Sequence, residues 1–190
     1  MSEPAAAAEP KIVAGRSCAG CTICCKLIQV RELDKPRLTW CTHCDKSQGC
    51  TIYATRPNGC RTFYCGWMMT PDLGQHWKPL HCKMVLTYEK AANRIAVHVD
   101  PGRLTAWREE PYYSDIKQWA RHALANQGQV IVWAGNRVFA ILPDRDKDLG
   151  AVQEGQHIVT RRREGPLGVE YDMVLLNLDD LPQDSTASPV

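Results

Sequence analysis

The chain has 190 residues, ten of them cysteines, and a formal net charge of +2. This length allows one or two small domains with a genuine core, and the near-neutral charge argues against nucleic acid as a partner. All ten cysteines lie within the first 82 residues. Because small apolar residues needed only for packing would be scattered along the chain, this segregation indicates that the sulfurs act together, in disulfides or on metal.

The N-terminus favours metal over disulfides. Residues 1–11 contain neither the basic stretch nor the apolar stretch of a secretory signal, and no run approaches the roughly 18 apolar residues of a membrane span. These features predict a cytoplasmic protein with no membrane partner. Because thiols are kept reduced in that compartment, dense cysteines there are more often metal ligands. Two bound Zn²⁺ with eight thiolates would change the formal charge from +2 to −2, because ligating thiols are deprotonated.

The chain divides into four parts by composition. Residues 1–14 are rich in Ala, Pro and Glu and are predicted to form a mobile tail. Residues 15–82 hold the cysteines, many turn-forming Gly and Pro residues and few apolar runs, so bound metal would have to supply much of the folding free energy. Residues 83–178 have the pattern of a small α+β domain, and residues 179–190 are predicted to fray.

Two β-hairpins and one helix are predicted in the α+β domain. The hairpin strands are expected at 84–88, 94–99, 129–134 and 137–142. Gly135-Asn136 is a two-residue turn typical of tight hairpins. The helix is expected from residue 115 to about 127, with Ser114 as its cap and Gly128 at its end. Further strands are expected at 156–161 and 171–176. The expected fold class is therefore α+β, with a cysteine-rich, loop-rich metal module packed on this domain.

The cysteine spacing is typical of metal ligands. Cys18, Cys21 and Cys24 form a C-x2-C-x2-C run, in which two intervening residues let the chain turn so that the sulfurs reach one ion at about 2.3 Å. Ferredoxin-type loops that bind iron–sulfur clusters share this spacing. Cys41 and Cys44 form a second C-x2-C pair.

An ordered series of residues follows the first cysteines. Cys25 comes directly after Cys24, and then come Cys41, Gly49-Cys50-Thr-Ile-Tyr53 and Arg56-Pro57-x2-Cys60-Arg61-x-Phe63-x-Cys65. Over roughly residues 16–67, this order resembles the CxxCxxCC (YkgJ-like) family of zinc- or iron-chelating domains. The resemblance implies eight metal ligands: Cys18, Cys21, Cys24, Cys25, Cys41, Cys50, Cys60 and Cys65. Cys44 and Cys82 stand outside the family pattern, and residues 83–190 have no counterpart in it.

Eight ligands suffice for two centres, either two Zn²⁺ ions or one [4Fe–4S] cluster and one Zn²⁺. Because neighbouring side chains diverge, Cys24 and Cys25 are expected in different sets. The high turn content favours zinc, and the C-x2-C-x2-C run favours iron. The expected function is metal binding, with a structural role, an adaptor surface for a protein partner, or carriage of the metal. The alternative is an iron–sulfur redox enzyme or electron-transfer accessory, and a nucleic-acid-binding zinc module is disfavoured by charge.

Other residues of the cysteine segment have ordinary as well as functional interpretations. Arg56 and Arg61 flank Cys60 and could offset thiolate charge, or be solvated arginines. The histidines at 43, 76 and 81 could replace a cysteine, although a lone histidine is more often no ligand. The tryptophans at 40, 67 and 77 are expected to cover the metal sites. Standard catalytic signatures are absent, so whether the protein is an enzyme stays open.

Overall fold

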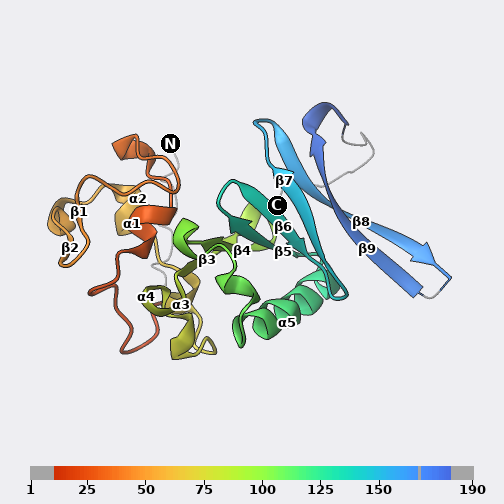
Figure 1. Cartoon of the computed structure of the whole chain (residues 1–190), viewed down its shortest axis with the longest axis horizontal. Helices are drawn as coiled ribbons and strands as arrows, with labels where there is room; N and C mark the ends of the chain where they lie inside the picture. Colours follow the sequence, from red (N-terminus) through yellow and green to blue (C-terminus); the bar gives the residue numbers. More distant parts are fainter. Residues whose placement is uncertain (1–10, 167, 181–190) are drawn as a thin grey trace, which may run out of the picture.

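The computed structural model of the chain describes residues 11–166 and 168–180, so most of the two predicted tails, 1–10 and 181–190, lies outside the described residues. Within those limits the fold is α+β, as the sequence predicts (Figure 1). The α-helices are α1 (Ile23–Leu27), α2 (Asn58–Arg61), α3 (Gly66–Met69), α4 (Pro79–Cys82) and α5 (Tyr112–Ala125). The strands are β1 (Cys44–Asp45), β2 (Gly49–Cys50), β3 (Met84–Glu89), β4 (Arg94–Val99), β5 (Gln129–Ala134), β6 (Arg137–Ile141), β7 (Asp146–Ala151), β8 (Gln156–Gly165) and β9 (Gly168–Asn177). The 3₁₀ helices are η1 (Arg31–Leu33), η2 (Tyr53–Thr55), η3 (Gln75–Trp77), η4 (Lys90–Ala92), η5 (Pro101–Arg103), η6 (Ala106–Arg108) and η7 (Leu178–Asp180).

A five-stranded sheet in the order β3-β4-β5-β6-β7 forms the centre of the molecule (Figure 1). It contains both predicted hairpins, β3–β4 and β5–β6. Asn93 closes the first with a left-handed backbone (φ 44°), and Gly135 provides φ 64° in the second. The two hairpins join through parallel pairing of β4 with β5, which α5 makes feasible because a parallel connection needs a crossover of a dozen or more residues.

The boundaries of α5 differ from the sequence prediction. The helix begins at Tyr112, so Ser114 lies inside its first turn instead of capping it. At the other end, Gln127 adopts the left-handed conformation expected of Gly128 (φ 55°). Gly128 is needed for a different reason: a Cβ atom there would lie 2.8 Å from the Asn93 carbonyl oxygen. The close approach of two backbones, rather than helix termination, therefore requires this glycine.

A second, two-stranded sheet is formed by β8 and β9, which are longer than the strands predicted there. In Figure 1 this ribbon continues past the end of the main sheet. Its base is fixed by the Gln129 side-chain amide, which donates to the Ile158 carbonyl oxygen (3.2 Å) and to the Thr160 hydroxyl (2.9 Å). Lys147 of β7 pairs with Asp172 of β9 at 2.8 Å.

One hydrophobic core joins the cysteine segment to the sheet. Ile116 and Ala120 of α5 belong to the same buried cluster as Val97 and Val132 of the sheet. From the cysteine segment, the buried members of that cluster are Ile23, Leu27, Cys65, Trp67, Met68, Trp77 and Cys82. They reach the sheet through contacts of α1, α3 and α4 with β3. The core therefore crosses the sequence boundary at residues 82 and 83.

The cysteine segment is also tied to the sheet by charge. Lys26, at the end of α1, donates to the Asp100 carboxylate at 2.6 Å, and Asp100 itself is largely buried after β4. Asp100 also accepts from the Gly102 backbone N–H at 2.8 Å. Across the two described ranges, no helix combines the length and the apolar character needed to cross a membrane.

Candidate metal centre

Short turns, rather than long elements, position the cysteines. The Cys21 backbone N–H donates to the Cys18 carbonyl (3.0 Å), and Gly20 between them has φ 69°. Cys24 and Cys25 lie on α1, where successive side chains point in different directions. The Cys41 N–H donates to the Cys25 carbonyl at 3.0 Å, which fixes the second half of the segment beside α1.

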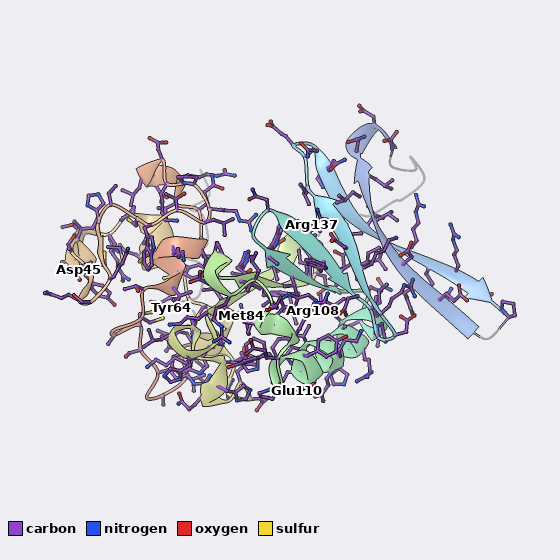
Figure 2. The ribbon with its side chains drawn as sticks, in the orientation of Figure 1. Asp45, Tyr64, Met84, Arg108, Glu110 and Arg137 are labelled. Atoms are coloured by element: carbon purple, nitrogen blue, oxygen red, sulfur yellow. The ribbon has the colours of Figure 1, made fainter. Side chains whose placement is uncertain are left out.

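The eight cysteines that the resemblance assigns as ligands line one cavity of about 260 Å³. They reach it from α1, the turn before it, β2, α2, the start of α3 and the loop before β1. Figure 2 labels Asp45 at the outer end of this segment and Met84 where it meets the sheet. Cys44 and Cys82 do not line the cavity in the described part of the chain, and all ten cysteines are free of disulfide bonds.

The eight sulfurs form one connected electrostatic network, because Cys25 acts on Cys18 and Cys24 as well as on Cys60, and we describe this network as two neighbouring sets. The first sulfur set comprises Cys18, Cys21, Cys24 and Cys65, because Cys18 and Cys21 act on each of the other two thiols. The second sulfur set comprises Cys25, Cys41, Cys50 and Cys60, because the first three all act on the Cys60 thiol. The thiols of Cys24 and Cys25 share a hydrogen bond where the two described sets meet, and their binding to different metal centres stays a prediction.

Three thiols of the first sulfur set, those of Cys18, Cys24 and Cys65, are shifted towards the protonated form. Burial, followed by the neighbouring Cys21, raises the pKa of Cys18, whereas the Arg56 guanidinium lowers it. The hydrogen bond that its thiol donates to Cys25, together with burial, raises the pKa of Cys24 well above its usual value. Burial also raises the pKa of Cys65. Deprotonation of this set therefore needs a compensating positive charge, as a metal ion provides.

The second sulfur set contains one thiol that ionises readily. Hydrogen bonds donated by the Cys24 and Cys44 thiols, with a contribution from the Lys35 ammonium, lower the pKa of Cys25 to about 6. Burial, and then the negative charge of Cys25, raise the pKa of Cys44 to about 12. Cys44 is therefore in contact with the second sulfur set although it does not line the cavity. Cys82 is different, since its thiol donates to carbonyls of Trp77 and Met84 in the core.

Two cationic side chains also line the cavity. They are Lys35 and Arg56, whereas Arg61, on the other side of Cys60, is exposed and does not line the cavity in the described residues. Burial lowers the pKa of Lys35, and the nearby sulfurs, led by Cys41, act in the opposite direction. Thiolate compensation by an arginine, which the sequence left open for both Arg56 and Arg61, is thus geometrically available to Arg56.

Some histidines and tryptophans of the segment line the cavity, and others lie away from it. His43 and Trp67 line the cavity. His76 instead lies 3.2 Å from the Asp115 carboxylate of α5. Trp77 is 1 % exposed, donates to Asp115 at 2.7 Å and packs against α5, so it belongs to the core rather than to the sulfur sites.

Sequence reasoning missed two residues that shape this site, Lys35 and Glu32. The Glu32 carboxylate accepts from the Gly59 backbone N–H at 2.7 Å and so orients α2, which carries Cys60. Neither residue lies near a cysteine in sequence, and the isolated charge of each offers no pattern to recognise. Gly49, before Cys50, has a positive φ (102°), whereas Gly59, before Cys60, does not. A Cβ at Gly59 would lie 2.9 Å from the end of the flexible Glu32 side chain, which would have to shift to make room for it.

The sulfurs surround a space without meeting at a point. Within residues 11–166 and 168–180, no group of three or more His, Cys, Asp or Glu side chains is placed so that it could hold a metal ion. The donor set nevertheless has suitable chemistry, because thiolates are the ligands that zinc and iron–sulfur clusters prefer. Metal occupancy and the number of centres therefore stay predictions.

Comparisons with known proteins add no further information. No family model, no curated protein and no solved structure matches this chain. The resemblance to the CxxCxxCC family therefore rests on the sequence alone and also stays a prediction.

Proposed function

We propose that the protein binds zinc or iron through the cysteine-lined cavity, and that residues 15–82 form a metal module on the α+β domain. One observation carries this proposal: eight of the ten cysteines, spread over 48 residues of sequence from Cys18 to Cys65, line the same cavity. Buried cysteines that served only as small hydrophobes would be distributed through the core, as Cys82 is.

The charge of the segment supports a bound thiolate centre. Residues 15–82 contain nine Lys and Arg against four Asp and Glu. This excess of positive charge is what a metal–thiolate centre would offset, because four thiolates on one Zn²⁺ leave two negative charges. The positive charge of the segment is therefore an argument for metal and not for nucleic acid.

The shape of the cavity favours an iron–sulfur cluster as the second candidate. A single Zn²⁺ requires four sulfurs converging at about 2.3 Å from one point, whereas here the eight cysteines are among the residues that line a cavity of about 260 Å³. A polynuclear cluster fills such a space and is also held by cysteine thiolates. The corresponding function is electron transfer or redox catalysis, and zinc would instead support a structural, adaptor or carrier role.

Elemental analysis of the anaerobically purified protein tests both candidates. Brown protein that contains iron and absorbs near 400 nm would support the cluster, and colourless protein with stoichiometric zinc would support the zinc site. Cys21→Ser in the first sulfur set and Cys60→Ser in the second should each lose about one centre, because serine stays protonated and binds metal poorly. Protein that holds neither metal after reduction and reconstitution would exclude the proposal.

Cys82→Ser and Cys44→Ser are the matched controls. Cys82→Ser should retain full metal content, since its thiol lies outside the cavity and a hydroxyl can donate to the same carbonyls. Cys44→Ser should also retain it, because Cys44 does not line the cavity. Loss of metal in Cys44→Ser as complete as in Cys21→Ser would instead make Cys44 a ligand, and one of the eight would have to be released.

A further inference from the structure

We infer that Lys35 and Arg56 are dedicated countercations of the two sulfur sets, Lys35 for the second and Arg56 for the first. This inference rests on the proposed metal binding, and it assigns to two non-ligating residues the role of stabilising the negative charge of each centre. Both side chains line the cavity together with the eight cysteines.

The ammonium of Lys35 is held at a fixed position inside the protein. The residue is 6 % exposed, and its Nζ donates to the carbonyl oxygens of Ile28 (2.5 Å), Pro36 (3.0 Å) and Lys26 (3.3 Å). Its backbone exchanges two hydrogen bonds of 3.0 Å with Val30, which closes the loop that carries it. This geometry leaves the charge little freedom to move towards water.

The charge that opposes Lys35 is supplied by sulfur. No carboxylate in residues 11–166 or 168–180 forms an ion pair with it, and a buried ammonium is costly unless it is paired. The groups that would favour its charged form, once deprotonated on a bound metal, are the thiols of Cys41, Cys25, Cys24 and Cys60. Three of these four belong to the second sulfur set. A negatively charged centre on that set would therefore complete the pairing of Lys35.

Arg56 occupies the corresponding place at the first sulfur set. Its guanidinium carbon lies 3.8 Å from the centroid of the Tyr53 ring, and its charge acts on the Cys18 thiol. Its Nε–H is buried and has no acceptor among the described residues. Buried donors normally have partners, and an exception can indicate an ion or ligand that belongs at the site. A thiolate or sulfide in the filled cavity is the acceptor that this N–H lacks.

Nearness in sequence does not explain these assignments. Arg61 is the residue after Cys60, yet it is exposed and lies outside the cavity lining in the described structure. Lys26 follows Cys25 directly, yet its ammonium is paired with Asp100. Lys35, by contrast, is ten residues after Cys25 and six before Cys41, and the closure of its loop places it on the cavity. The fold therefore places Lys35 and Arg56 on the cavity and keeps Arg61 and Lys26 away from it.

Countercations of this kind should favour the reduced state of a bound metal centre, because that state carries more negative charge. Iron is a suitable probe, because a thiolate-bound iron centre accepts one electron from an electrode while its ligands remain in place. The reduced centre carries one more negative charge than the oxidised one. Removing an adjacent cation should therefore lower the midpoint potential, whereas a purely structural substitution would have no reason to shift it in that direction.

The test uses the full-length protein reconstituted with iron, with potentials measured by redox titration. We expect Lys35→Met to lower the midpoint potential of one centre and Arg56→Gln that of the other. Lys35→Arg and Arg56→Lys should restore most of the potential because they restore the charge. Arg61→Gln is the matched control and should leave both potentials unchanged.

Other outcomes would overturn the inference, one of its two parts, or the proposed metal binding. Unchanged potentials in Lys35→Met and Arg56→Gln, or an equal shift in Arg61→Gln, would overturn the inference. Loss of iron in both Lys35→Met and Lys35→Arg would show that Lys35 acts through the backbone of its loop and would overturn its part, while Arg56→Gln still decides the other part. A wild-type protein that takes up no iron and no zinc would instead refute the proposed metal binding itself.

Discussion

His98 illustrates at the scale of one residue how the cysteine segment changes the chemistry of the sheet. The imidazole lies on β4, with its Nε2 atom 2.9 Å from the Thr87 hydroxyl of β3, and its Nδ1 atom is buried. Burial, and then the Arg37 guanidinium, lower the pKa of His98 to about 3. Arg37 comes from the cysteine segment and lies 4.3 Å above the Trp133 ring. Burial, with a smaller contribution from Arg37 of the cysteine segment, therefore keeps this histidine neutral.

This shift predicts that the fold loses stability on acidification. Between the unfolded pKa of 6.5 and the folded pKa of about 3, the unfolded chain binds a proton at His98 that the folded chain does not. The free energy of unfolding should therefore fall as the pH drops through this window, by roughly 3–5 kcal/mol in full, at about 1.4 kcal/mol per pKa unit.

Urea denaturation of the wild type and of His98→Gln at pH 6.5 and pH 4 measures this effect. The variant keeps a polar group beside Thr87 and loses the titration, so it should lose less stability than the wild type over the same interval. Equal losses in the two proteins would show that His98 is protonated in the fold.

The sequence was sufficient to predict the cavity cysteines but not their surroundings. The family resemblance names the eight expected ligands without a structure, whereas spacing alone would also include Cys44, which forms a C-x2-C pair with Cys41. Lys35 and Glu32 affect the site only because loops close in space, Lys35 through three carbonyls and Glu32 through the Gly59 N–H. Such contacts leave no periodicity and no spacing in the sequence.

At the scale of elements, Arg16 fixes the chain that follows α3. Its guanidinium donates to the carbonyl oxygens of Thr70 (2.8 Å), Pro71 (3.0 Å) and Leu73 (2.6 Å), and also to that of Trp67. It lies 4.9 Å from the centroid of the Trp67 ring as well. These carbonyls lie at and beyond the end of α3, where helix and turn leave backbone acceptors unpaired. Arg16 thus joins the start of the cysteine segment to its end.

Arg16→Ala should consequently destabilise the protein by about 1–3 kcal/mol, the range for charged hydrogen bonds lost from partly buried carbonyls. Arg16→Lys should recover only part of this loss, because an ammonium cannot span the acceptors that a planar guanidinium reaches. The measurement is the midpoint of thermal unfolding with metal content held constant. Arg31→Ala, at an exposed position of the same segment, should change the midpoint little, and an equal decrease there would contradict the assigned role of Arg16.

The elements themselves were predictable where their signals are local. Both hairpins follow from alternating apolar strands and short turns, and α5 follows from its apolar face. The parallel pairing of β4 with β5 could not be predicted, because it depends on how α5 packs over the sheet. β7 was missed since Asp146–Ala151 is mostly polar. β8 was underestimated because Arg161-Arg162-Arg163 resembles a solvated turn, whereas cross-strand pairing with β9 continues to Gly165.

At the scale of the whole molecule, the cysteine segment and the sheet share their core. β3 lies at the edge of the sheet (Figure 1), and Met84, Val85 and Leu86 at its start are almost fully buried. Part of that burial comes from α1, α3 and α4, which all contact β3. Among the other four strands, β5 and β6 contact α5, and β4 lies between β3 and β5. Loss of order in the cysteine segment should therefore affect the sheet unevenly.

Removing the metal should reveal how unevenly the strands of the sheet depend on the cysteine segment. If metal supplies much of the folding free energy of residues 15–82, chelation should abolish amide protection there. Amides of β3 should lose part of their protection, because the start of the strand loses its cover, whereas those of β4, β5 and β6 should keep theirs. Hydrogen–deuterium exchange with mass spectrometry, before and after chelation, resolves these segments. A chelator presaturated with zinc is the control.

Two other exchange results would contradict this expectation. Unchanged exchange throughout residues 15–82 would mean that the apolar contacts of Ile23, Leu27 and Trp67 are enough to hold the segment, and that the metal is peripheral to folding. Loss of protection throughout the sheet would mean that the α+β domain depends on the cysteine segment to complete its core. The expected result lies between them because three helices of the cysteine segment pack against β3, while α5 covers the centre of the sheet.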